Sequence, residues 1–206
     1  MAKKESTFKN MTIALFVITA VAGLALSAVY SVTKEPIAAS QKAKINNAIK
    51  MVIPEFESIL DTVLMPEDGK DSIIVHRLLK GAEKSGVAVQ TYTDDGFSGR
   101  FTLMVGFLPD GSISNIEVLE HKETPGLGTK MALPAFKDQF KGLKIADLPG
   151  EKLKVKKDGG TVDAITAATI SSRAFCDAVN RAHAINKKGG RAILCSISPS
   201  KRLARL

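Results

Sequence analysis

The feature that most constrains this sequence is an uninterrupted apolar run near its N-terminus. Residues 10–33 contain no charged side chain, and Met11 to Val32 are 22 consecutive, mostly apolar residues. As a helix rising about 1.5 Å per residue, this run would span roughly 33 Å, enough to cross a hydrocarbon core of about 30 Å. The small residues at 26–28 are also compatible with a cleaved signal peptide, but signal-peptide apolar regions are normally only about 7 to 15 residues long. The sequence therefore predicts a single transmembrane helix over residues 10–33.

The charges at the two ends of the chain predict its orientation in a membrane. Three lysines against one glutamate give residues 1–9 a charge of +2, and six basic residues give the segment 187–206 a charge of +6. The positive-inside tendency places residues 1–9 in the cytoplasm and the main domain on the extracytoplasmic (periplasmic) side of a cell inner membrane. Because the two ends account for the whole net charge of +8, the body is formally neutral. With no Trp and few aromatic residues, it is not expected to bind nucleic acid.

Between the membrane run and the body, the pattern predicts an amphipathic connector helix over residues 34–54. Glu35-Pro36 can begin a second helix, because proline is tolerated in a first turn, and apolar residues recur at helical spacing until Pro54. Residues 55–186 are predicted to form one extracytoplasmic domain that begins with a loop-rich entry up to residue 72. We expect residues 187–206 to form a basic tail that is either flexible or bound to a partner.

The domain itself is predicted to have an α+β fold, with an antiparallel sheet flanked by helices. Strand-like segments occur at 73–78, 87–92, 101–107, 113–119 and around 152–156. Asp110-Gly111 is a strong tight-turn pair and predicts a hairpin between the third and fourth of these. A short helix is expected at 134–140, and a final helix over 173–185, where apolar residues share one face.

Hydroxyl groups are concentrated just before that final helix. The stretch combines an aspartate, two threonines and two serines around a pair of alanines, namely Asp163, Thr166, Ala167, Ala168, Thr169, Ser171 and Ser172. A helix N-terminus stabilises phosphate through unpaired N–H groups and a partial positive charge, and small residues let the phosphate approach the backbone. A hydroxyl here could therefore contact a phosphate or carry one. The alternative is that Thr166 or Thr169 only caps the helix, since threonine is common in that position.

Two glycine-containing segments lie upstream of this stretch. Gly96-Phe97-Ser98-Gly99 precedes the predicted hairpin, and Glu123-Thr124-Pro125-Gly126-Leu127-Gly128-Thr129-Lys130 follows it. Glycines at these positions would let another group come close to the backbone, and the N–H groups of the second segment could point inward. Glu123 and Thr124 could hydrogen-bond a ligand or simply brace the turn. Each segment taken alone is compatible with a plain turn.

In this order, the three segments resemble the motifs of a flavoprotein family. Residues 163–169 resemble the Asp-x-x-(Ser/Thr)-Gly-Ala-Thr signature at which a flavin transferase joins FMN to a threonine, with Ala167 where the family usually has glycine. Residues 96–99 and 123–128 resemble the Gly-aromatic-x-Gly strand and the Glu-Thr-Pro-Gly-Leu-Gly loop of an FMN-binding domain. That domain occurs in the G subunit of Rnf electron-transport complexes and in the C subunit of sodium-pumping NADH:quinone reductases. The compact chain, with its anchor and connector, is more similar to the Rnf G subunit.

The resemblance implies a cofactor, an attachment site and partners. FMN would be joined to Thr169 by a phosphoester bond, and the other cofactor-binding positions would be Asp163, Thr166, Ala168, Ile170, Ser171, Glu123, Thr124, Gly126, Leu127, Gly128 and Ser98. The partners would be the other membrane subunits of an Rnf complex and, during maturation, a flavin transferase. The implied role is to relay electrons in a ferredoxin:NAD oxidoreductase that moves sodium ions or protons, without catalysis by this chain on its own.

Other chemistry finds little support in the sequence. His76, His121 and His183 are far apart and form no paired metal-ligand motif, and neither a GxSxG nor a phosphate-loop pattern occurs. Cys176 and Cys195 fit no metal spacing; they could form a disulfide, or Cys176 could be a buried free thiol. The alternatives to the Rnf role are the C subunit of a quinone reductase and a membrane-anchored assembly or binding protein without redox activity.

Overall fold

The computed structural model describes residues 7–64, 71–81 and 83–192. The chain forms two compact units, Met1–Ile45 and Asn46–Leu206. The first unit contains most of one long helix. The second contains that helix's last turns, a sheet and all other described elements.

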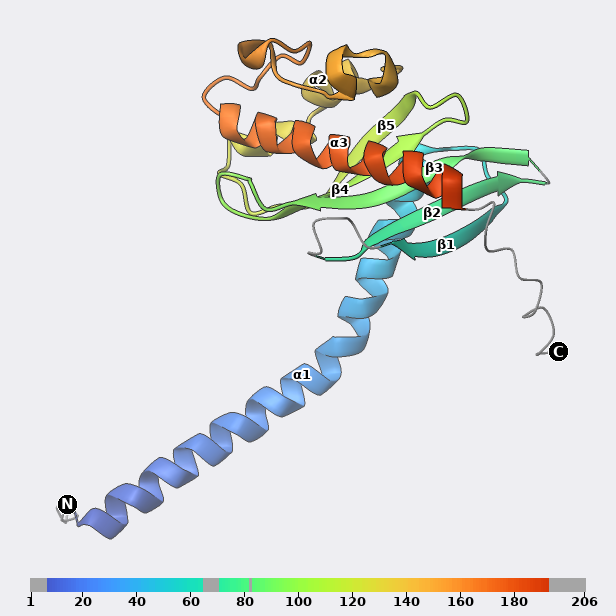
Figure 1. The fold of residues 1–206 in the computed structure, drawn as a ribbon. Coiled ribbons are helices and arrows are strands. Elements are labelled where there is room, and N and C mark those ends of the chain that lie inside the picture. The colour runs from blue at the N-terminus through green and yellow to red at the C-terminus, as the bar shows by residue number, and fades with distance from the viewer. Residues whose placement is uncertain (1–6, 65–70, 82, 193–206) are drawn as a thin grey trace. The chain divides into compact units, whose positions relative to one another are not determined.

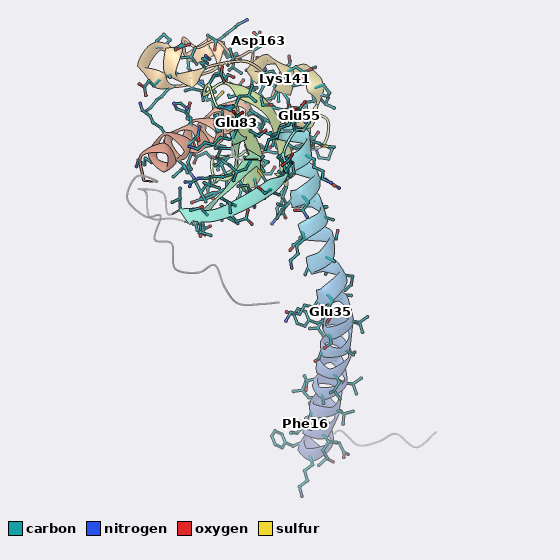
Figure 2. All side chains as sticks on the ribbon, turned by 90° about the vertical axis from the view of Figure 1, so that its right-hand side faces the viewer. Phe16, Glu35, Glu55, Glu83, Lys141 and Asp163 are labelled. Atoms are coloured by element: carbon teal, nitrogen blue, oxygen red, sulfur yellow. The ribbon has the colours of Figure 1, made fainter. Side chains whose placement is uncertain are left out.

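The long helix α1 (Phe8–Val52) carries the predicted membrane segment (Figure 1). Within the described ranges it is the one helix long and apolar enough to cross a membrane, and it is consistent with an N-terminal anchor. The apolar side chains of its membrane segment are exposed, as Phe16 illustrates in Figure 2 with 73% of its surface accessible. The prediction of a second helix beginning at Glu35-Pro36 was wrong, because α1 runs through Pro36 without a break. Because Pro36 has no N–H, the Val32 carbonyl has no hydrogen-bond donor within the helix. Val32 is the last residue of the apolar run, so water can reach this carbonyl and donate to it.

A five-stranded antiparallel sheet forms the centre of the second unit, confirming the predicted α+β class. Its strands follow chain order, with β1 (Ser58–Leu64), β2 (Ile73–Lys80), β3 (Glu83–Thr93), β4 (Phe101–Phe107) and β5 (Ile113–Glu120). The last four agree with the strands predicted from residue 73 onward. The loop predicted over residues 58–64 was wrong, because these residues form β1. It is a largely exposed edge strand, so its side chains do not alternate between buried and exposed positions, which is the sequence pattern that predicts a strand. Pairing with β2 holds it in the sheet.

Helix α3 (Thr169–Ala192) packs across one face of the sheet (Figure 1). Phe175, Val179 and Ala182 are buried in the core, as their spacing predicted. The Thr91 hydroxyl of β3 donates to the Ala178 carbonyl at 3.2 Å, which fixes the helix against the sheet. α3 begins four residues before the predicted segment. It also continues to residue 192, so the first part of the predicted tail is helical, and residues 193–206 lie outside the described chain.

The last turns of α1 cover the opposite face of the sheet. Ile49 and Val52 are buried there, against strands that carry glycine at the points of contact. A Cβ atom placed on Gly106 of β4 would lie 2.8 Å from the Val52 carbonyl oxygen. The absence of side chains at Gly106 and Gly86 therefore allows the end of α1 and the following residue, Ile53, to pack directly on the sheet backbone.

Short helical turns connect β5 to α3. They include η1 (Gly128–Ala132), α2 (Pro134–Lys137) and η2 (Asp138–Phe140), and the last two confirm the predicted short helix. The strand predicted around 152–156 is absent; a single parallel bridge, Val155–Val162, takes its place. The side-chain amide of Asn180 on α3 bonds both the N–H and the carbonyl of Leu153, at 2.8 and 2.9 Å. This amide supplies the hydrogen bonds that a neighbouring strand would otherwise make.

Candidate functional site

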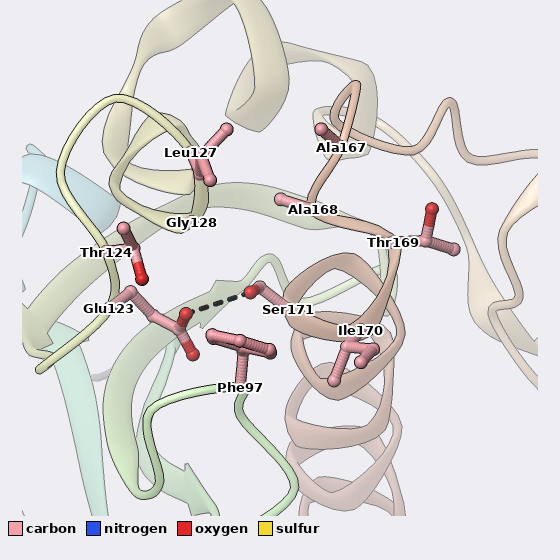
Figure 3. A pocket seen from close by; sticks show the side chains of 10 residues that line it. All are labelled: Phe97, Glu123, Thr124, Leu127, Gly128, Ala167, Ala168, Thr169, Ile170 and Ser171. Carbon is pink, nitrogen blue, oxygen red and sulfur yellow. Dashed lines mark hydrogen bonds between the residues drawn. The ribbon is translucent and has the colours of Figure 1, made fainter.

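A pocket of about 300 Å³ lies beside the first turn of α3 (Figure 3). It is lined by Phe97, Glu123, Thr124, Leu127, Gly128, Ala167, Ala168, Thr169, Ile170 and Ser171. Although the three sequence segments lie far apart along the chain, the fold brings all of them to this pocket. The pocket volume is at the lower end of the range typical of small-molecule sites. Phe97 and Ala167 line it although the sequence reasoning did not select them, and their positions within two of the motifs could have identified them.

Glu123 holds the three segments together. Only 5% of its surface is exposed, and its carboxylate accepts a hydrogen bond from the Ser171 hydroxyl at 3.0 Å and another from the Ser98 N–H at 3.4 Å. Gly96 and Gly128 make room for the carboxylate, since a Cβ atom at either position would collide with its oxygens. These contacts make Glu123 a brace between the segments, and its side chain also lines the pocket.

Among the described residues, no side chain caps the start of α3. The first helical hydrogen bond runs from the Ser172 N–H to the Ala168 carbonyl at 3.0 Å, so Ala168 occupies the capping position and has no side-chain oxygen to offer. In the described chain, neither Thr166 nor Thr169 bonds a backbone N–H, and the interpretation of these threonines as caps was wrong. The first N–H groups of the helix, from Thr169 to Ser171, have no acceptor within the helix. They are therefore available to an anion.

The turn that leads into α3 has an unusual backbone at Ala167. Its φ angle is +61°, in the left-handed region where glycine is favoured and an L-residue is disfavoured by roughly 1–2 kcal/mol. The turn is held by the Ser172 hydroxyl, which accepts from the Ile165 N–H and donates to the Ala168 carbonyl, both at 2.9 Å. The left-handed turn explains why glycine would suit this position, and why a small residue stands here.

A cationic side chain contacts the Thr169 hydroxyl. The ammonium of Lys157, in the turn η5 (Lys156–Asp158), lies 3.4 Å from Thr169 Oγ1. Arg173, one turn further along α3, makes two hydrogen bonds of 2.7 Å to Asp158. These bonds lower the pKa of the Asp158 carboxyl below its usual value. The hydroxyl thus sits at an electropositive helix start.

Four predicted site residues do not line the pocket, namely Asp163, Thr166, Gly126 and Ser98. Asp163 and Thr166 border a separate surface hollow together with Lys130, Leu133, Ala135, Phe136, Gln139, Ala164 and Ile165. The Asp163 carboxylate pairs with Lys156 at 2.7 Å. Its backbone N–H donates to the Gln139 side chain at 2.8 Å, and its carbonyl accepts from the same side chain at 3.3 Å. In this structure Asp163 therefore positions the corner before α3.

Two further predicted residues shape the loops around the pocket. Gly126 has a φ angle of +76°, which glycine adopts readily, and its N–H donates to the Thr129 hydroxyl at 3.0 Å. Ser98 takes part through its backbone N–H, which bonds Glu123. These two residues set the shape of their turns.

The histidines and the cysteine in the described ranges lie in separate parts of the fold. No group of three or more His, Cys, Asp or Glu side chains within these ranges could hold a metal ion. Cys176 is a buried free thiol, and burial raises its pKa to about 12. Its predicted alternative partner, Cys195, lies outside the described residues. His76 Nδ1 lies 2.6 Å from Asp61 Oδ1, which ties β2 to β1.

Comparison with known proteins identifies the family. The FMN-binding domain family model matches residues 96–184, which include all three segments around the pocket. The chain is 31% identical over 183 residues to the G subunit of the ion-translocating oxidoreductase complex of Aliivibrio fischeri, an alignment that covers 84% of this chain and 86% of that protein. It is 33% identical over 186 residues to the G subunit of the same kind of complex in Methanosarcina acetivorans, covering 87% and 93%. The chain belongs to the G-subunit family of ion-translocating oxidoreductase complexes.

For this G-subunit protein, a solved structure supports the fold alone. The crystal structure of the C subunit of the Na⁺-translocating NADH-quinone reductase from Parabacteroides distasonis aligns with a TM-score of 0.53 and 18% identity, covering 76% of this chain and 95% of that one. Membership of the G-subunit family therefore rests on the sequence relatives, and the quinone-reductase alternative has support at the level of the fold only.

The pocket of this G-subunit protein has features that suit FMN. Its walls combine the exposed apolar side chains of Phe97, Leu127 and Ile170 with the unbonded N–H groups at the start of α3. The apolar side chains can contact a flat ring, and the N–H groups can bind a phosphate. An apolar wall and an anion-binding helix start thus occur side by side.

Proposed function

We propose that this protein is an electron-relay subunit that carries FMN through a phosphoester bond to Thr169. One observation carries the proposal: the Thr169 hydroxyl stands at the uncapped start of α3, on the wall of a pocket within the FMN-binding domain. The nearby Lys157 ammonium adds positive charge where a phosphate would lie. No side chain competes for the first N–H groups of the helix in the described part of the chain.

The residues of the pocket have distinct roles in this proposal. The N–H groups of Ile170 and Ser171 bind the phosphate oxygens, and Ala168 lets them approach the backbone. Phe97 and Leu127 contact the ring, and Glu123 holds their loops at a fixed separation. FMN, when bound, supplies reversible one- and two-electron transfer, while the protein sets its position and environment. A covalent bond retains the cofactor in a compartment where a dissociated flavin would be lost.

The proposed setting is a membrane complex. α1 anchors the chain in the inner membrane, with the N-terminus in the cytoplasm and the flavin domain outside it. The other membrane subunits donate and accept the electrons. The complex transfers electrons between ferredoxin and NAD and moves sodium ions or protons. The protein described here passes electrons onward without binding either of those substrates.

Coexpression of the full-length chain with a flavin transferase tests the attachment. We expect the denatured protein to fluoresce in a gel under ultraviolet light and its intact mass to include FMN. Thr169→Ala should abolish both signals, because it removes the oxygen that forms the ester. Thr166→Ala is the matched control and should retain them, since Thr166 borders the other hollow.

The possible results separate the proposals. A covalent flavin that persists in Thr169→Ala and disappears in Thr166→Ala would move the attachment to Thr166. A wild-type chain without fluorescence or added mass would contradict the electron-relay role and favour an assembly or binding role without redox activity.

A further inference from the structure

Lys157 makes an unusual contact for a surface lysine. Its ammonium nitrogen lies 3.4 Å from Thr169 Oγ1, a neutral hydroxyl, and in the described residues no carboxylate lies within ion-pairing distance of it. Surface lysines more often point into solvent or toward an acidic side chain. Here the positive charge is directed at the oxygen that we propose carries the phosphoester.

Two cations close in sequence to Lys157 and Thr169 are each paired with a carboxylate. Lys156, the preceding residue, pairs with Asp163 at 2.7 Å. Arg173 makes two 2.7 Å hydrogen bonds to Asp158, whose carboxylate is thereby occupied. Of these three cations, Lys157 is the one with no carboxylate in direct contact among the described residues, although its charge still acts on Asp158 at longer range.

The backbone around Lys157 is held in place. The bridge between Val155 and Val162 closes the turn that carries it, through hydrogen bonds of 2.8 and 3.2 Å. Asp158 ties the same turn to α3 through Arg173. Because these contacts persist without Lys157, replacing its side chain should leave the turn intact.

We infer that Lys157 neutralises the phosphodiester on Thr169 and is a positioning residue for flavin attachment, an inference that rests on the proposed function. Attachment forms a bond from Thr169 Oγ to the FMN phosphorus of a flavin dinucleotide. It breaks the phosphorus–oxygen bond of the diphosphate, releases the nucleoside monophosphate and leaves the hydroxyl proton to solvent. The resulting diester carries one negative charge. The Lys157 ammonium lies where it contacts that charge, as charge-assisted hydrogen bonds require.

The experiment compares unmodified and flavinylated full-length protein in detergent. In Lys157→Ala, we expect the melting temperature of the flavinylated form to fall by about 2 to 4 °C, while that of the unmodified form stays unchanged. The contact with the diester exists only after attachment, so only that form should lose it. With limiting transferase, the rate at which FMN mass appears should also fall by about threefold to tenfold.

Two variants serve as controls. Lys154→Ala removes the same charge from the same segment. Lys154 and Lys157 both help to lower the pKa of Asp158, but Lys154 makes no contact with Thr169. It should leave both measurements unchanged. Lys157→Arg keeps the charge, so its flavinylated form should retain most of the wild-type melting temperature and its FMN mass should appear at close to the wild-type rate. High salt should reduce the difference between Lys157→Ala and wild type, because the contact is exposed.

The outcomes distinguish this inference from the proposed function. A wild-type chain that gains no FMN mass overturns both. If the wild type is flavinylated but Lys157→Ala and Lys154→Ala behave alike, or Lys157→Ala lowers the melting temperatures of both forms equally, the role of Lys157 is overturned and the attachment stands.

Discussion

At the scale of the residue, the candidate site depends on one buried carboxylate. Glu123 accepts hydrogen bonds from the Ser98 N–H and the Ser171 hydroxyl, and it lies against Gly96 and Gly128. A buried charge is costly unless hydrogen bonds satisfy it, and here those bonds come from two separate segments. The carboxylate therefore sets the distance between the loops that form the pocket.

Removing this carboxylate should destabilise the domain. We expect Glu123→Ala to lower the free energy of unfolding by about 2–4 kcal/mol, because it leaves the buried Ser171 hydroxyl and the part-buried Ser98 N–H without an acceptor and opens a cavity. Glu123→Gln should cost less, about 1 kcal/mol, since the amide oxygen can still accept one bond. Chemical denaturation of the purified chain measures both. The control is Glu120→Ala, at an exposed position, which should change the free energy of unfolding by less than about 0.5 kcal/mol. If Glu120→Ala lost as much stability as Glu123→Ala, the bracing role of Glu123 would be contradicted.

At the scale of the element, both faces of the sheet are covered by helices that lie far apart in the sequence. α3 packs on one face through the core side chains of its apolar stripe, and the last turns of α1 pack on the other. In the second contact, α1 lies close to the backbone of the sheet, because Gly106 has no side chain to separate it from Val52. The C-terminal end of α1 is therefore part of the folded domain.

This close contact gives a prediction for Gly106. The added methyl of Gly106→Ala would lie 2.8 Å from the Val52 carbonyl oxygen, so α1 must shift away from the sheet. We expect the domain to lose about 1–3 kcal/mol of stability and about 3–10 °C in melting temperature. Thermal unfolding followed by circular dichroism measures the change. The control is Gly23→Ala in the apolar half of α1, where a Cβ atom would meet nothing; it should leave the domain's melting temperature unchanged. A Gly106→Ala melting temperature equal to that of the wild type would contradict the close packing of Val52 on Gly106.

At the scale of the whole molecule, charge and hydropathy divide the chain. A helix with an apolar N-terminal half precedes a domain whose body is formally neutral, and positive charge is concentrated at the two ends. The basic residues before the apolar run favour a cytoplasmic N-terminus. That orientation would place the flavin domain and its maturation outside the cytoplasm.

Protease access to sealed vesicles tests this orientation. In vesicles with the extracytoplasmic face outward, we expect the domain from residue 46 onward to be digested where it is accessible, and an N-terminal epitope to be protected. Inverted vesicles should give the opposite result, because the membrane then shields the domain. Digestion of the domain in inverted vesicles alone would reverse the proposed topology.

Local signals in the sequence were sufficient for much of the fold. The apolar run, the Asp110-Gly111 turn and the periodicity of the last helix depend on neighbouring residues, so they could be interpreted without coordinates. The three motifs also identified the segments that form the pocket and the threonine on its wall. β1 could not be predicted, because an exposed edge strand depends on pairing with a distant partner. The break at Pro36 was predicted wrongly because proline lowers helix stability without excluding a helix.

The amino-acid sequence by itself determined that this protein has a membrane-type helix, an antiparallel α+β domain and three motifs of a flavin-binding family. The tertiary structure alone decided where the motif residues lie and which groups they contact. It made Glu123 a brace, gave the capping position to Ala168, turned Asp163 and Thr166 toward a separate hollow, and brought Lys157 to Thr169. The physical reason is that hydrophobic periodicity and turn preference act over a few residues, whereas hydrogen bonds and charge contacts depend on distances between segments that only the folded chain brings together.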